Sequence, residues 1–393
     1  MSEYIPLEVQ EEILKRLPVK PLIQFRSVSK QWRSFIDSPD FIASYGVRQT
    51  HPNRLILRYK HIINPLHGEE RYLAFVDNDH SFIKQDITPA VPGLIKDIET
   101  NSIVVGSSHG LLCVNSYYKF GDGYPYDGTE IVVLWNPSIN KSIGIEVPYM
   151  HDLSVFVSDV TGFGVCPVTF DPTIVKIGYG FHSPWKVEIF TLSTGTWRIL
   201  STNLPRESIR DLENWSQVVI DRFIYWAAVN LFVAEDDPSR FWIISFDLTA
   251  KEFKEINLTG TLTNQLFSIQ GISKLRGSLV VLSYHGEFEE DPSVCCLWMM
   301  KEQGISKSFT KLYTINLPDA TVKTLLGFRK TGDLILETQH QNEENAQLEV
   351  YNPYSKAIDN LGVDGKYYSV FMCYMVSLLL HDQLDGFIYT ISN

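Results

Sequence analysis

One short sequence unit recurs through most of this 393-residue chain at nearly constant spacing. Each copy is an apolar run around one aromatic residue, followed by a turn and a second run. Neighbouring copies are 55, 56, 52 and 53 residues apart, and a weaker copy at Phe75 precedes the first by 60. A period of roughly 50 residues with about four strands per unit is typical of β-propeller blades, whose aromatic residues we expect to pack as core. The residues that mark the five clear copies are Trp135, Phe190, Phe246, Trp298 and Tyr351.

The two ends of this repetitive region indicate how the blades could form a closed ring. After the last copy one apolar strand remains, around Phe371–Leu380, whereas the first copy has no such strand before Arg54. A C-terminal strand that completes the first blade would remove the exposed sheet edges that promote aggregation. We therefore predict a six-bladed β-propeller over residues 54–393, closed by the C-terminal strand. A large β-sandwich or an irregular β domain remains the alternative.

Residues 1–48 differ from the rest because their apolar residues recur at helical spacing. Val9, Ile13 and Leu17 lie four positions apart, which places them on one face of a helix. Pro18 ends that helix, and Ser38 followed by Pro39 is a typical helix start. Four short helices in about forty residues cannot close a self-sufficient core. The predicted fold class is therefore α+β multidomain, with a small helical head that needs support and a large all-β domain.

Charge and cysteine content limit the classes of partner and compartment. The chain has 46 acidic and 34 basic residues, a net charge of -12, which argues against broad binding to nucleic acid or anionic lipid. Residues 1–45 carry six acids and six bases, so the all-β region carries the whole excess. The five cysteines show no C-x-x-C spacing, which favours a reducing compartment. The start of the sequence lacks the pattern of a signal peptide, so we expect a cytoplasmic or nuclear location.

The N-terminal segment from Ile5 to Phe41 resembles an F-box, with Ile5 in place of the usual first leucine. Its two Leu-Pro steps, its Phe-Arg-x-Val-Ser-Lys-x-Trp core and its Ser-Pro-x-Phe exit occur in the expected order. The body resembles the F-box-associated, kelch-like propeller domain of plant F-box proteins, although no Gly-Gly doublet occurs. The stretches that carry this second resemblance are Gly106–Cys113, Leu134–Ser138, Gly162–Gly164, Ser245–Leu248, Leu297–Lys301 and Tyr351–Pro353.

This resemblance implies a non-catalytic substrate receptor of an SCF-type, cullin-RING ubiquitin ligase. The F-box would dock on a Skp1-like adaptor, and the propeller would hold a target protein for ubiquitination by other subunits. The sequence does not separate the side chains that face the adaptor from those that fill the module's own core. The residues expected either to contact the adaptor or to fill this core are Ile5, Pro6, Ile13, Leu14, Leu17, Pro18, Leu22, Val28 and Trp32.

Motifs for catalysis or metal binding are weak in this sequence. Residues 106–110 match the G-x-S-x-G pattern, but a strand pattern follows them where a nucleophile elbow requires a helix, so we predict a hairpin turn. The ten histidines form no metal-binding motif. We therefore expect no catalytic residue, metal or other cofactor. A hydrolase-like propeller enzyme and a scaffold protein unrelated to ubiquitin remain alternatives.

Three long loops are the candidate target-binding elements, at residues 119–129, 233–240 and 285–291. The first carries Tyr124 and Tyr126, and the second carries Glu235, Asp236 and Asp237. Aromatic residues supply contact area at low entropic cost, and acidic residues favour basic partners. We therefore predict that some of these loops share one face and recognise a basic protein segment. The alternative is that they are solvated connections on different faces.

Overall fold

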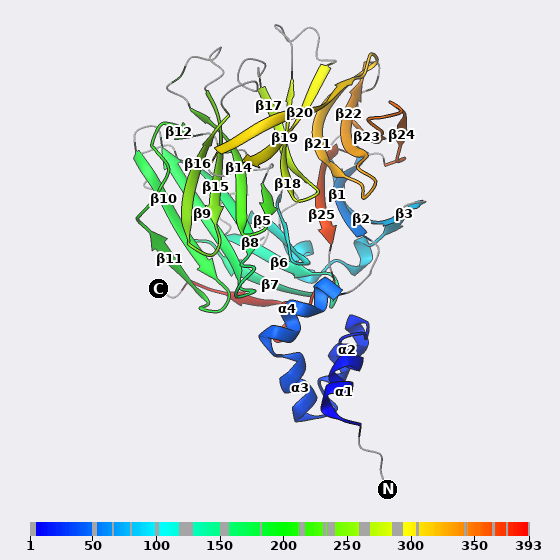
Figure 1. Ribbon diagram of the computed structural model, residues 1–393, viewed down its shortest axis with the longest axis vertical. Coiled ribbons are helices and arrows are strands. Elements are labelled where there is room, and N and C mark those ends of the chain that lie inside the picture. The colour runs from blue at the N-terminus through cyan, green and yellow to red at the C-terminus, as the bar shows by residue number, and fades with distance from the viewer. Residues whose placement is uncertain are drawn as a thin grey trace.

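The computed structural model has a ring of β-sheets with four short helices beneath it (Figure 1). The helices are α1 (Leu7–Leu14), α2 (Val19–Phe25), α3 (Lys30–Ile36) and α4 (Pro39–Arg48). The structure describes residues 5–48, 53–64, 67–78, 81–98, 102–117, 129–149, 157–180, 183–210, 212, 217–230, 233, 240–258, 268–284, 294–303, 306–341, 343, 345–363, 366–374 and 376–391.

The strands form six separate sheets, which are the six blades of a β-propeller, and all neighbouring strands are antiparallel except β26 and β7 of the second blade. The first blade takes strands from both ends of the chain, and its order is β25-β1-β2-β3. These four strands are β25 (Lys366–Tyr374), β1 (Asn53–Asn64), β2 (His67–Asn78) and β3 (Ser81–Asp86). The second blade contains β4 (Ile103–Ser108), β5 (Leu111–Tyr117), β6 (Glu130–Asn136), β7 (Lys141–Glu146) and β26 (Phe387–Tyr389). The third contains β8 (Val157–Val165), β9 (Pro172–Gly180), β10 (Ser183–Thr191) and β11 (Thr196–Leu200).

The remaining three blades follow one another along the chain. The fourth contains β12 (Ile209–Arg210), β13 (Val218–Ile220), β14 (Phe223–Asn230), β15 (Phe241–Asp247) and β16 (Glu252–Asn257). The fifth contains β17 (Ser268–Leu275), β18 (Ser278–Tyr284), β19 (Val294–Gln303) and β20 (Ser306–Asn316). The sixth contains β21 (Ala320–Phe328), β22 (Leu334–His340), β23 (Gln347–Tyr351) and β24 (Ile358–Asn360). A short 3₁₀ helix, Thr88–Ala90, and helix α5, Gly93–Asp97, connect the first two blades.

The predicted ring closure is confirmed by the pairing of β25 with β1. The two strands are antiparallel, with Leu57 opposite Val370 and Arg54 opposite Tyr374. The strand begins earlier than the sequence pattern indicated, and it ends at Tyr374. Val376 and Leu378 pack against the helices, and Leu379 and Leu380 pack against the second blade and its neighbour.

The repeated aromatic residue occupies the same place in every blade. Phe75 and its five counterparts all lie on the third strand from the centre of the ring, and each side chain is at most 3% exposed. They are therefore core residues, as predicted. The turn that follows is held by its first side chain in several blades. Asp247, for example, accepts hydrogen bonds from the backbone N–H groups of Thr249 and Ala250 through one carboxylate oxygen.

The four N-terminal helices form a small module, which we call the helical module (residues 5–48). Its helix starts follow the sequence signals, because Ser29 caps α3 by accepting a hydrogen bond from the N–H of Trp32, and Pro39 opens α4. Its buried core contains one residue from the far end of the chain, Leu378, which is 1% exposed. The module thus needs support from outside, as predicted. The members of this core from the helices themselves are Leu14, Leu22, Ile36, Phe41 and Tyr45.

Candidate functional site

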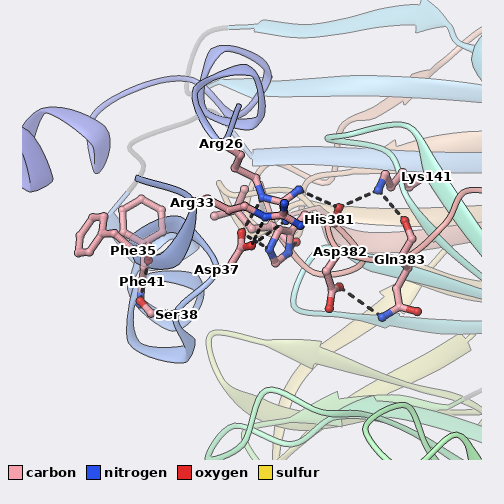
Figure 2. Close-up of polar contacts among 11 residues, drawn as sticks. Arg26, Arg33, Phe35, Asp37, Ser38, Phe41, Lys141, His381, Asp382 and Gln383 are labelled. Carbon is pink, nitrogen blue, oxygen red and sulfur yellow. Dashed lines mark hydrogen bonds and ion pairs between the residues drawn. The ribbon is translucent and has the colours of Figure 1, made fainter. Parts of the chain in front are cut away.

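The helical module meets the ring through a partly buried polar cluster around the buried side chain of His381, shown in Figure 2. Arg26 donates two hydrogen bonds to Asp37, of 2.6 and 2.8 Å from Nε and Nη2. The ring of His381 lies 2.9 Å from Asp37 through Nε2 and 2.8 Å from the carbonyl oxygen of Leu378 through Nδ1. Both neighbours of this ring are acceptors, so only a doubly protonated imidazole makes both hydrogen bonds at once.

Asp37 is the charged centre of this cluster. Burial of its carboxyl opposes ionisation, but the hydrogen bond from Arg26 and the nearby positive charges outweigh burial and lower the pKa of Asp37. The carboxylate therefore joins α2, α3 and the C-terminal segment at ordinary pH. None of these side chains was predicted as functional, since His381 and Asp37 lie 344 residues apart and belong to no motif.

The chain after β25 fastens the module to the second blade, and we call residues 376–391 the strap. Buried Asn136 donates from its side-chain amide to the carbonyl oxygens of Ser377 and Leu379, at 3.0 and 2.7 Å. Lys141 donates to the carbonyl oxygens of His381 and Gln383. The strap ends as β26, which pairs in parallel with the outer strand β7. One segment therefore contacts both the helical module and the ring.

The outer surface of the helical module exposes apolar side chains that its own core does not use. Val9 and Ile13 lie one turn apart on α1, and each is 48% exposed. Ile5 and Val28 are 51% and 61% exposed. Exposed apolar residues on so small a module are candidates for contact with another protein. We call these four residues the docking face.

The structure divides the nine predicted adaptor-binding residues into three groups. Leu14 and Leu22 are at most 1% exposed and belong to the core of the module. Leu17 and Trp32 are half-buried against that core, and the indole N–H of Trp32 donates to Gln10 on α1. The side chains left available to a partner are those of Ile5, Pro6, Ile13, Pro18 and Val28. Val9 was not among the nine predicted residues, although its side chain is also exposed.

A chamber of about 670 Å³ lies between the ring and helix α4. Turns between inner strands of the blades form its roof, including residues 106–109 of the second blade and 273–277 of the fifth. Ile42 and Ala43 of α4 and three residues of the strap form its floor. The G-x-S-x-G sequence lies in this roof as a tight hairpin, because His109 and Gly110 both have positive φ values, 48° and 79°. The predicted hairpin turn is confirmed.

The predicted target-binding residues Tyr124, Tyr126, Glu235, Asp236 and Asp237 lie outside the described residues. The strands that flank their loops are described. The turns before β5, β14 and β18 line the chamber, so these strands run away from the helical module. The distal ends of these three strands therefore lie on the opposite face of the ring.

Within the described part of the chain, no group of three or more His, Cys, Asp or Glu residues is placed to hold a metal ion. The described helices also include none that is long and apolar enough to span a membrane. Four described cysteines, Cys113, Cys166, Cys295 and Cys296, are buried with free thiols.

A module of four short helices fastened beneath a closed six-bladed propeller is the arrangement expected for one class of protein, the propeller-bearing F-box proteins. Comparison with protein families agrees with this class. The F-box domain matches residues 3–44, and the F-box associated beta propeller domain matches residues 79–384. The chain therefore belongs to the family of F-box proteins that carry an F-box associated propeller domain.

Curated relatives of the chain come from Arabidopsis thaliana. F-box protein At5g18160 is 24% identical over 340 residues, which cover 85% of this chain and 76% of the relative. F-box/kelch-repeat protein At3g23880 is 26% identical over 330 residues, which cover 79% of both chains. F-box protein CPR1 is 26% identical and matches over 80% of this chain and 73% of its own length.

Solved structures with a similar arrangement are more distant. Trypanosoma rangeli sialidase has a TM-score of 0.42 and 11% identity, and the match covers 81% of this chain and 53% of the sialidase. An oligogalacturonate lyase in complex with manganese has a TM-score of 0.38 and 10% identity, over 80% of this chain and 86% of the lyase. At this level of similarity the two enzymes provide no argument about activity or ligands.

Proposed function

We propose that this protein is the substrate-recognition subunit of an SCF-type ubiquitin ligase. In this role the docking face binds a Skp1-like adaptor, and the ring binds the target protein. The observation that supports the proposal most strongly is the exposed apolar face of a module that matches the F-box domain. Burying Val9 and Ile13 in an adaptor would remove apolar surface that the module leaves in water.

The proposed contribution to ubiquitin transfer is proximity and not chemistry. The strap and the Arg26–Asp37–His381 cluster fasten the docking module to the ring. A target held on the ring would then keep a restricted position relative to the catalytic subunits bound through the adaptor, which raises the effective concentration of the reacting groups. The cytoplasm or nucleus is the proposed location.

The docking proposal is tested with the full chain and a purified Skp1-type adaptor. We expect Ile13→Asp to weaken adaptor binding at least about tenfold, because a charge would enter an apolar interface. Ile13 is exposed, so the variant keeps the module folded. The matched control is Ile199→Asp on β11, a 79% exposed isoleucine of the ring. Failure of the unmodified chain to bind would refute the function, whereas equal binding by both variants would refute the docking face alone.

The target is proposed to be a protein with a basic segment, bound on the face of the ring away from the helices. The acidic excess of the all-β region and the acidic loop residues favour such a partner. Neutralising Glu235, Asp236 and Asp237, and separately replacing Tyr124 and Tyr126 by Ala, should reduce target capture and leave adaptor binding unchanged. Proximity labelling with a ligase-inactive complex supplies the candidate targets. Unchanged target capture in both variants would refute the assignment of target binding to these loops.

A further inference from the structure

The chamber between ring and α4 combines apolar walls with a cationic rim. Lys274 and Arg276 flank the turn between β17 and β18, and Lys330 lies in the turn between β21 and β22. All three residues line the chamber and are exposed to solvent. The chain as a whole carries a net charge of -12, so three cations at one opening are a local reversal of its charge.

The other charged residues of the lining leave this positive excess in place. Arg329 is held by Asp77 through two hydrogen bonds of 3.1 Å, so these two charges balance each other. Asp221 is the remaining acidic residue among those that line the chamber. Burial, together with the charge of Lys274, lowers the pKa of His109, whose ring is therefore neutral at pH 7. The lining thus carries four cationic side chains, of Lys274, Arg276, Arg329 and Lys330, against two acidic ones, of Asp77 and Asp221.

The walls of the chamber are suited to an apolar group. Ile42 of α4, Leu275 of β17 and Val376 of the strap contribute aliphatic surface, and Phe328 adds an aromatic ring. The volume of about 670 Å³ falls within the range of small-molecule sites, which are largely apolar and contain few charged groups. A ligand with an apolar body and one anionic group would satisfy both the walls and the rim.

We propose that this chamber binds a small amphipathic organic anion, with its carboxylate, sulfonate or phosphate at Lys274, Arg276 and Lys330 and its apolar body against the floor. The proposal is independent of the ubiquitin-ligase function. Because Ile42 and Val376 belong to the helical module and the strap, a bound ligand would contact both the docking module and the ring. Binding would therefore stabilise the junction between them.

The test uses the fluorescent anion 1-anilinonaphthalene-8-sulfonate with the folded full chain. We expect saturable binding to one site that weakens as salt is added, because the rim charges are screened. The triple variant Lys274→Gln, Arg276→Gln, Lys330→Gln should bind the probe about tenfold more weakly, because it removes the three exposed cations that attract the sulfonate. The uncharged analogue N-phenyl-1-naphthylamine should bind the triple variant and the unmodified chain equally.

Two controls distinguish binding of the probe in the chamber from binding elsewhere on the surface. Arg198→Gln, Lys301→Gln and Lys356→Gln remove the same number and kind of exposed charges elsewhere on the ring, and should change probe affinity less than about twofold. Ala43→Phe fills the floor of the chamber and should abolish binding with an unchanged thermal transition. If Ala43→Phe fails to fold, the charge variants decide the question alone. Absence of saturable binding, or equal weakening in the rim and control triples, would overturn the proposal.

Discussion

The ring and the helical module are stabilised in different ways, although one chain builds both. Each blade of the ring packs its core against the next blade, and strand β25 closes the ring into a self-contained domain. The module buries six core residues, and one of them, Leu378, comes from the strap. A repeated unit can thus complete its own core by repetition, whereas a short helical segment must obtain the missing part from elsewhere in the chain.

The largest expected effect comes from a truncation that removes residues 366–393. It takes away the inner strand of the first blade together with the strap, so both regions lose their closing element. We expect no cooperative thermal transition by circular dichroism, and aggregation through the exposed edge of β1. A soluble truncated chain that still melts cooperatively would show that ring closure is unnecessary for stability.

A shorter truncation, of residues 376–393, tests whether the two regions depend on the strap differently. The ring keeps β25 and should retain a cooperative transition, while the module loses Leu378 and the contacts of His381. We expect rapid proteolytic cleavage within residues 5–48 and slow cleavage of the ring, measured by limited proteolysis with mass spectrometry. Equal protection of the two regions would contradict the comparison.

Glu337→Gln should change the stability of the ring alone. Burial raises the pKa of this carboxyl on β22 from 4.5 to about 7. Below pH 4.5 the group is neutral in the folded and unfolded states, and above pH 7 the folded state carries the full penalty of a buried charge. The variant should therefore be up to about 3 kcal/mol more stable than the unmodified chain at pH 8, at about 1.4 kcal/mol for each pKa unit, and nearly equal to it at pH 4.

Denaturant unfolding of the ring at the two pH values measures this difference, with the exposed Glu207→Gln as the matched control. Protection of residues 5–48 against hydrogen exchange should stay the same in both variants. A gain at pH 4 as large as that at pH 8 would mean that the effect of Glu337 is not electrostatic.

The smallest effect is expected from Asp37→Asn at the junction. The pKa of Asp37 is lowered, so its stabilising contribution is present above the usual value of 3.8 and is lost as the pH falls below it. In the unmodified chain, hydrogen exchange of α3 should therefore increase on acidification through this range. The variant should exchange faster than the unmodified chain at pH 7 and respond less to acid. An unchanged exchange rate at pH 7 would show that the cluster contributes nothing to the junction.

The sequence was sufficient to predict the ring, because the aromatic residue that marks a blade recurs in every blade. Five aromatic residues at similar spacing identified the third strand of five blades, and the weaker Phe75 identified the sixth. The junction between the helical module and the ring could not be predicted. Its residues belong to no repeated pattern, and their partners are distant in the sequence. Asn136 was recognisable as a turn residue, but nothing in the pattern shows that its side chain binds the strap.

The docking face was predictable only in part. Apolar residues such as Leu14 and Ile13 are adjacent on α1, and helical periodicity does not decide which of them faces the interior. That choice depends on where α4 and the strap lie, which is a property of the tertiary structure. The loops that carry the predicted target-binding residues follow no repeat, so their arrangement also could not be obtained from the pattern.

The place of Leu378 in the helical module has a consequence for the order of events during protein synthesis. The helices leave the ribosome first, yet the residue that completes their core follows Arg48 by 330 residues. A nascent or prematurely terminated chain therefore carries an unfinished helical module, whose core of Tyr45, Phe41 and their neighbours lacks Leu378. The first blade is completed by β25 and the module by Leu378, and both follow strands β1 to β24 in the chain, so the helical module acquires its full core only once the ring can close.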